Sequence, residues 1–201
     1  LEARLNNFEA GSFSETTTAS FSADFAIGAV DGGTSTTDDE VNAGYGFQID
    51  LNTSFTGEDS FDVSIDAGNA STAGVTELDL NQTSETLTVD GISYTFPVGG
   101  ATVLVGDTVD GSSLFTTACA YGGPSNTLDD CGNVNAAFVG GGTTFGASYD
   151  FDNGFTAALG YAGAGDSTDG LMTQEGADSY GGNVAYTCLL YTSDAADDMF
   201  R

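Results

Sequence analysis

The stretch that decides the fold is Val41-Asn42-Ala43-Gly44-Tyr45-Gly46-Phe47-Gln48-Ile49-Asp50-Leu51-Asn52-Thr53-Ser54-Phe55. For fifteen residues, apolar side chains (or Thr) at odd positions alternate with glycine or polar side chains at even positions. A period of two predicts a β-strand with one apolar and one polar face. At roughly 3.3 Å per residue this strand would be about 50 Å long, whereas typical soluble strands have about 5–6 residues. A membrane strand needs about 9–11 residues and can extend beyond the bilayer, so the length favours a membrane strand.

Seven further segments repeat the alternation, two of them diluted by glycine. We therefore predict eight strands, the other seven being 19–29, 60–67, 92–98, 101–105, 139–151, 155–161 and 180–186.

The connections between these segments alternate in length. Thr56–Asp59, Gly99-Gly100 and Asp152–Gly154 are short, and the others (31–40, 68–85, 106–134 and 163–178) are long. Bacterial outer-membrane barrels are built in this way, with short periplasmic turns and long external loops. Aromatic residues, which are enriched at membrane interfaces, also bracket the short turns; they are Phe55, Phe61, Phe96, Phe151 and Phe155. We expect an all-β fold, an antiparallel transmembrane β-barrel; a secreted β-sandwich such as an adhesin is the alternative.

The composition excludes several classes of function. Thirty acidic residues face two basic ones, Arg4 and Arg201, and the net charge is −28. Nothing in the chain neutralises phosphates, so a nucleic-acid partner is excluded. The chain has no His, the commonest general base, and no GxSxG or Walker-type loop, so we expect neither an enzyme nor a cofactor. The longest apolar run, Phe25–Val30, is too short for a transmembrane helix.

The polar positions of the first three strands supply the candidate site. We predict that they line a water-filled lumen, where carboxylates attract cations and repel anions. The alternative is that these acids only keep the lumen wet and the loops soluble. The predicted lumen residues are Asp24, Gln48, Asp50, Asn52, Asp62 and Asp66.

Three stretches resemble the cyanobacterial outer-membrane porins that carry an N-terminal S-layer-homology (SLH) domain, relatives of the carbohydrate-selective OprB-like porins. The first is Leu1-Glu2-Ala3-Arg4-Leu5 leading into Phe13-Ser14-Glu15-Thr16-Thr17-Thr18. The second is Ile49-Asp50-Leu51-Asn52-Thr53-Ser54-Phe55-Thr56-Gly57-Glu58-Asp59, continuing to Asp66-Ala67-Gly68-Asn69. The third is Ile92-Ser93-Tyr94-Thr95-Phe96-Pro97-Val98-Gly99.

The resemblance implies a porin of the cell outer membrane that lets small hydrophilic solutes and ions, carbohydrates or inorganic ions, diffuse passively. It implies a barrel of about sixteen strands with roughly half of them in residues 13–187, surrounded by outer-membrane lipid. It further implies a homotrimer, and an upstream SLH domain that binds peptidoglycan through a coiled coil ending in residues 1–12. A structural protein that tethers the outer membrane to the cell wall is the alternative. The chain is more acidic than the family, and positions around Gln48 and Val63, often basic there, are not basic here.

The longest predicted loop holds Cys119 and Cys131. In an oxidising envelope compartment this pair predicts a disulfide, which would contribute about 3 kcal/mol on the chain-entropy model. A Cys₂ metal site is the alternative, but no His or further Cys supports it, and we expect no metal. This is the third long loop, the position at which porins often fold a loop into the lumen, so we hypothesise a stapled constriction loop.

Residues 188–201 differ from the rest. Cys188–Asp198 resembles the translation of a transposase adapter used in sequencing libraries, so we expect the natural sequence to end near Thr187. An ordinary ninth strand or tail is the alternative.

Overall fold

A computed structural model describes residues 16–29, 41–69, 83–116, 142–164 and 170–186. Eight strands form one sheet, and the described ranges contain no helix, which confirms the all-β class. The strands are β1 Thr17–Gly28, β2 Asn42–Thr53, β3 Ser60–Gly68, β4 Thr88–Val98, β5 Ala101–Asp107, β6 Thr143–Asp150, β7 Phe155–Gly163 and β8 Asp178–Tyr186.

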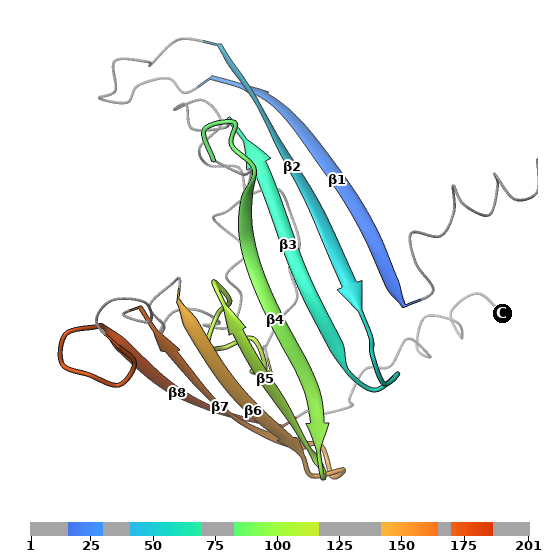
Figure 1. Cartoon of the computed structure of the whole chain (residues 1–201), viewed down its shortest axis with the longest axis vertical. Helices are drawn as coiled ribbons and strands as arrows, with labels where there is room; N and C mark the ends of the chain where they lie inside the picture. The colour runs from blue at the N-terminus through green and yellow to red at the C-terminus, as the bar shows by residue number, and fades with distance from the viewer. Residues whose placement is uncertain (1–15, 30–40, 70–82, 117–141, 165–169, 187–201) are drawn as a thin grey trace, which may run out of the picture.

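The sheet is a simple antiparallel meander, in which each strand pairs with the strand that follows it in sequence (Figure 1). Because the chain reverses direction at every connection, alternate connections lie at the same end of the sheet. The connections at one end are 54–59, 99–100 and 151–154, and those at the other are 29–41, 69–87, 108–142 and 164–177. The predicted alternation of short and long connections is therefore confirmed, and we name the two ends the short-turn end and the long-loop end.

The turn between β6 and β7 shows how local sequence produces a short connection. The Phe151 amide donates to the Phe155 carbonyl at 3.0 Å and closes the hairpin. Asp152 (φ 57°) and Gly154 (φ 87°) adopt the left-handed backbone that the reversal requires, a conformation that Gly and Asp tolerate better than most residues. The Asn153 carboxamide oxygen accepts from the Phe155 amide at 3.2 Å. The tight hairpin is thus specified by residues within the turn itself.

The register keeps one apolar and one polar face continuous across the sheet. Ile49 of β2 lies opposite Ile65 of β3, and Gln48 lies opposite Asp66, so residues of like character share a face. Side chains alternate between the two faces along each strand, and every strand pair preserves this parity except at one bulge between β3 and β4. We call the two surfaces the apolar face and the polar face.

The observed strand boundaries differ slightly from the predicted ones. β2 has twelve residues rather than fifteen, because Val41, Ser54 and Phe55 lie outside its ladder. β4 begins at Thr88 rather than Ile92. The bulge reverses the alternation of apolar and polar residues, so residues 88–91 do not continue the period of two that starts at Ile92. Of the strand predicted over 139–151, positions 139–141 lie outside the described residues and β6 covers Thr143–Asp150.

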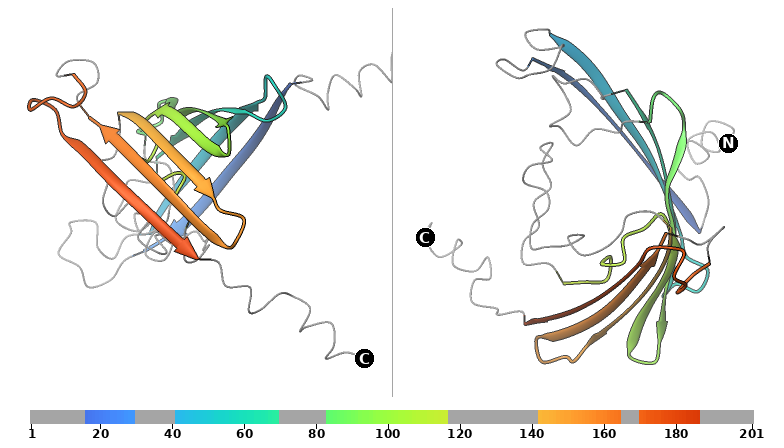
Figure 2. Two further views of the ribbon diagram at one scale, coloured as in Figure 1. Left: turned by 90° about the horizontal axis from the view of Figure 1, so that it is seen from below. Right: turned by 90° about the vertical axis from the view of Figure 1, so that its left-hand side faces the viewer.

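The sheet lacks the buried apolar layer of an ordinary sandwich. Among the described residues only five apolar side chains are buried, and three of them are alanines: Ala67, Leu104, Ala158, Tyr161 and Ala162. Eighteen large hydrophobic side chains are exposed instead, including Phe25 at 83% and Val184 at 77%. The sheet curls into a trough (Figure 2). Residues 108–116 contact the polar face and lie inside the curve, so the polar face is the concave one.

Candidate functional site

All six predicted lumen residues lie on the polar face. Asp24 is on β1, Gln48, Asp50 and Asn52 are on β2, and Asp62 and Asp66 are on β3. The register sets Gln48 opposite Asp66 and Asn52 opposite Asp62, and it sets Asp24 beside Gly46. Residues that are far apart in sequence thus form one acidic surface over three adjacent strands, which we call the acidic wall.

Asp50 occupies the centre of the acidic wall and accepts hydrogen bonds from three strands. Its Oδ1 accepts from Gln48 Nε2 at 2.8 Å and from Ser64 Oγ at 2.7 Å. Its Oδ2 accepts a longer bond from Ser20 Oγ at 3.5 Å. Hydroxyl and amide donors hold the carboxylate in place without neutralising its charge.

The two acids of β3 are held in the same way. The Asn52 carboxamide donates to Asp62 Oδ1 and to Ser60 Oγ, and Ser60 Oγ donates to Asp62 Oδ2 at 2.6 Å. Thr88 Oγ1 donates to Asp66 Oδ1 at 2.6 Å, and Asp66 is only 7% exposed. The part of the chain that the structure describes contains no Lys, Arg or His, so no cationic side chain there compensates these charges.

The acidic wall gains a member that the sequence pattern missed. Asp90 is the extra residue of the β3–β4 bulge, between Val89 opposite Ile65 and Gly91 opposite Ser64. Thr88 and Gly91, on either side of the bulge, lie opposite Asp66 and Ser64, so the bulge places Asp90 beside the acidic wall. No periodicity could have found it, because a bulge residue breaks the alternation by definition.

The half of the polar face built by β5–β8 is different in character. Apart from Asp150 at the last position of β6, its strand positions carry small or neutral side chains, among them Gly146, Thr156, Ala158 and Asn183. Residues 108–116, which follow β5, cover this half; Leu104 on β5 is buried beneath them (5% exposed). The polar face therefore has an acidic half on β1–β4 and a second half, on β5–β8, that residues 108–116 cover; because Asp150 is the one acid among the strand positions of the second half, we call it the neutral half.

Aromatic side chains mark both ends of the apolar face. At the short-turn end, rings contact in the pairs Phe55–Phe61, Tyr94–Phe96, Tyr149–Phe151 and Phe155–Tyr186. At the long-loop end, they contact in the pairs Phe25–Tyr45, Phe145–Tyr161 and Tyr161–Tyr180. The first belt includes all five predicted aromatics, and the second was not predicted. Between the belts the face is aliphatic or small on β6–β8, for example Ala147, Leu159 and Val184.

One carboxylate fastens the first short turn. Asp59 Oδ1 accepts from the Phe55 and Thr56 amides at 3.0 and 2.8 Å and from the Ser54 and Thr56 hydroxyls, each at 2.8 Å. Its Oδ2 accepts from the Tyr94 hydroxyl at 2.7 Å. The Tyr94 hydrogen bond, helped by those of Thr56 and Ser54 and opposed by burial, holds the pKa of Asp59 well below its usual range. The residue is therefore a charged structural anchor of the turn.

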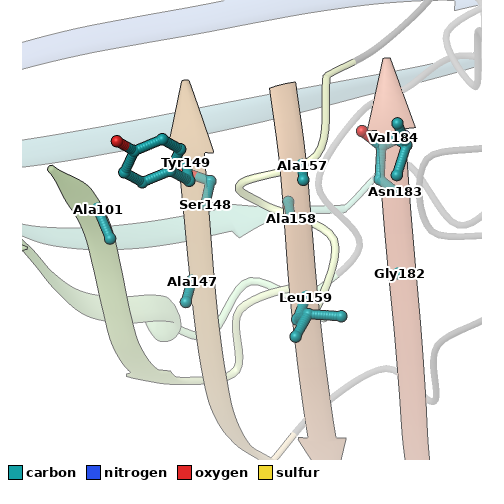
Figure 3. A pocket seen from close by; sticks show the side chains of 10 residues that line it. All are labelled: Ala101, Ala147, Ser148, Tyr149, Ala157, Ala158, Leu159, Gly182, Asn183 and Val184. Atoms are coloured by element: carbon teal, nitrogen blue, oxygen red, sulfur yellow. The ribbon is translucent and has the colours of Figure 1, made fainter. Parts of the chain in front are cut away.

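The apolar face carries a hollow of about 410 Å³ between β5 and β8 (Figure 3). Small residues, such as Ala101, Ala147 and Gly182, form its floor, and Tyr149 and Leu159 rise beside it. None of its lining residues is a carboxylate, thiol, imidazole or amine. The hollow thus fits an apolar group and offers no acid–base chemistry.

No helix among the described residues is long and apolar enough to cross a membrane. In the same residues, no group of three or more His, Cys, Asp or Glu side chains is arranged to hold a metal ion. The predicted disulfide Cys119–Cys131 and the predicted segments 1–12 and 188–201 lie outside the described residues.

Comparisons of the chain with protein-family models, curated proteins and solved structures give no match.

Proposed function

We propose that this chain forms part of an outer-membrane porin through which small hydrophilic solutes and ions diffuse passively, with a preference for cations. The observation that carries the proposal is the two-faced sheet. One face is apolar, exposed and bordered at both ends by aromatic rings, while the concave face opposite is polar and acidic.

The apolar face supports a membrane location on energetic grounds. Monomeric soluble proteins rarely expose a contiguous apolar patch larger than a few hundred Å², and larger patches mark interfaces with membranes or partners. Membrane barrels present an outward apolar band flanked by aromatic girdles, and the two belts at the ends of the strands match that arrangement. Outer-membrane lipid is the proposed neighbour of this face.

Barrel closure belongs to the proposal as well. In a bilayer an open sheet edge would leave backbone N–H and C=O groups without partners, at a cost of several kcal/mol each. The outer edges of β1 and β8, each paired on one side in the described sheet, therefore need backbone partners, which closure into a barrel supplies. The resemblance to SLH-domain porins suggests a barrel of about sixteen strands.

Cation preference follows from the acidic wall. A monovalent cation about 4 Å from one carboxylate gains about 1 kcal/mol in bulk water and about 4 kcal/mol at an effective dielectric constant of about 20, and an anion is disfavoured by as much. Neutral donors hold Asp50, Asp62 and Asp66, so their charges act on passing ions without compensation. The acids occupy successive positions along the strands, from Asp62 near the short-turn end to Asp24 nearer the long-loop end, so the bias extends along the path rather than acting at one point.

The resemblance also supports three proposals about the natural context. They are a homotrimer, an SLH domain that tethers the barrel to peptidoglycan, and a carbohydrate or an inorganic ion as the solute. A tethering role can coexist with transport, and a cell-wall pull-down with the upstream domain tests it separately.

Planar-bilayer recording of the full-length protein tests the porin function. We expect stepwise conductance and, across a salt gradient, a reversal potential of the sign that a cation-preferring pore gives. Absence of any conductance from protein that is folded in detergent would overturn the proposal and favour a secreted β-protein. Conductance with anion preference would leave the porin but overturn the role of the acidic wall.

A further inference from the structure

We infer that Asn183 and Thr156 are positioning residues that clamp residues 108–116 onto the neutral half of the polar face and so confine passage to the acidic wall. This inference rests on the proposed porin function. We call residues 108–116 the inward segment; it leaves β5 at the long-loop end and follows the polar face toward the short-turn end.

The inward segment is first fixed near the long-loop end. The Thr108 amide donates to the Gly142 carbonyl at 3.0 Å, which joins the segment to the residue before β6. The Thr144 hydroxyl then donates to the Val109 carbonyl, and Thr144 is fully buried. A buried hydroxyl that is satisfied in this way favours a defined position of the segment over a range of positions.

In the middle, apolar packing holds the inward segment against the sheet. A Cβ atom at Gly146 of β6 would lie 3.3 Å from Leu114 Cδ1 and 3.7 Å from Leu104 Cβ. Leu114 can approach this closely because position 146 has no side chain. Leu104, the largest apolar residue among the polar-face positions of β5–β8, is buried under the segment and lies beside the same point at Gly146 as Leu114. Packing of the inward segment therefore accounts for the absence of a side chain at position 146 and for the buried leucine at position 104.

Near the short-turn end, the inward segment is clamped to two strands at once. The Thr116 amide donates to Asn183 Oδ1 at 3.2 Å, and Asn183 Nδ2 donates back to the Thr116 carbonyl at 3.4 Å. The Thr116 and Thr156 hydroxyls lie 2.7 Å apart. Asn183 belongs to β8 and Thr156 to β7. The inward segment, which begins at the end of β5, therefore extends across β6 and β7 as far as β8.

This path has a consequence for permeation. Where the inward segment lies over β6, β7 and β8, it excludes solute from the neutral half of the polar face. The remaining half carries Asp50, Asp62 and Asp66, so an ion that passes the segment must travel close to these carboxylates. The clamp thus determines both the open cross-section and the closeness of ions to the acidic charge.

The test compares single-channel conductance and cation-to-anion permeability of the full-length protein with those of Asn183→Leu, Thr156→Val and the double variant. Asn183→Leu keeps the number and branching of the side-chain heavy atoms and removes both hydrogen bonds, and Thr156→Val replaces only the hydroxyl. Ser148→Ala, on the polar face of β6, is the matched control. Heat-modifiable migration on gels verifies that each variant folds.

We expect the double variant to raise conductance roughly 1.5- to 2-fold and to lower the cation-to-anion ratio, because the released segment opens the neutral half. The single variants should show part of this effect and Ser148→Ala none. Folded, conducting variants that keep the conductance and ion ratio of the wild type would overturn the clamp and leave the porin intact. A folded wild type without conductance would instead overturn the proposed function on which the clamp rests.

Discussion

The Tyr94 hydroxyl of β4 donates to the Asp59 carboxylate of the β2–β3 turn at 2.7 Å, so one strand fastens the turn between its two predecessors. The aromatic ring of Tyr94 lies on the apolar face beside Phe96 and Phe55, while its hydroxyl reaches a charged acceptor beyond the strand end. Tyrosine suits this place because it combines an apolar body with a polar tip. Tyr161 repeats the arrangement at the opposite end, where its hydroxyl donates to Asp178 at 2.6 Å.

The Asp59 anchor predicts acid sensitivity of the folded protein. Its pKa in the fold is below the ordinary value of 3.8, so its stabilising contribution is fully present above about pH 4 and is lost as the pH falls toward the folded-state pKa. Denaturant unfolding in detergent, repeated between neutral and strongly acidic pH, should show a decline in stability at the acid end that Asp59→Ala reduces.

The matched control for this experiment is Glu58→Ala. Glu58 is the neighbouring residue and is exposed, so its removal should leave the acid-dependent decline of the wild type intact. Equal pH profiles for wild type and Asp59→Ala would contradict the anchor role.

Contact of the apolar face with lipid predicts that an arginine at an exposed position on this face destabilises the folded protein. Leu159 is 69% exposed, and in a water-facing sheet Leu159→Arg should change the free energy of unfolding by no more than about 0.5 kcal/mol. In a barrel the same change near the bilayer midplane should destabilise by about 2–4 kcal/mol. Reversible unfolding of the full-length protein in lipid vesicles measures the difference.

Ser22→Arg is the control for the Leu159 experiment, because Ser22 is an exposed residue on the polar face of β1. We expect it to be tolerated. Similar small effects of the two arginines would argue that the apolar face does not contact lipid.

The acidic wall predicts a graded loss of cation preference. Changing Asp24, Asp50, Asp62 and Asp66 together to Asn keeps size and polarity but removes four charges, so the cation-to-anion permeability ratio should fall by about threefold or more. Reversal potentials across a salt gradient give the ratio directly. Glu58→Gln with Asp152→Asn, which removes two charges at turns, should have a much smaller effect, and an unaltered ratio in the fourfold variant would dismiss selectivity by these acids.

The contact at Gly146 predicts a local packing defect. In Gly146→Val the added atoms meet Leu114, so either the inward segment shifts or the strand is strained, at a cost of about 1–3 kcal/mol. Gly182→Ala is the comparison, because its Cβ would meet Leu159 at an ordinary 3.4 Å. Unfolding midpoints of both variants measure the difference, and equal midpoints would show that Leu114 does not pack closely at this position.

The sequence by itself determined the number of strands, their order and the two faces of the sheet. Alternation in Asn42–Thr53 and the turn residues around Gly154 act over a few positions, so they can be recognised without knowing what lies beside them. The six predicted lumen residues shared one face for the same reason, since the parity of a strand fixes the direction of its side chains.

Only the tertiary structure decided which residues meet across strands. Asp90 joins the acidic wall through a bulge, the second aromatic belt depends on the register of β6–β8, and Thr116 reaches Asn183 across three strands. The spacing of residues along the chain contains no information about such neighbours, because they are set by register and by the path of a long connection. The local pattern therefore gave the sheet and its faces, and the pairing of distant segments gave the details of the site.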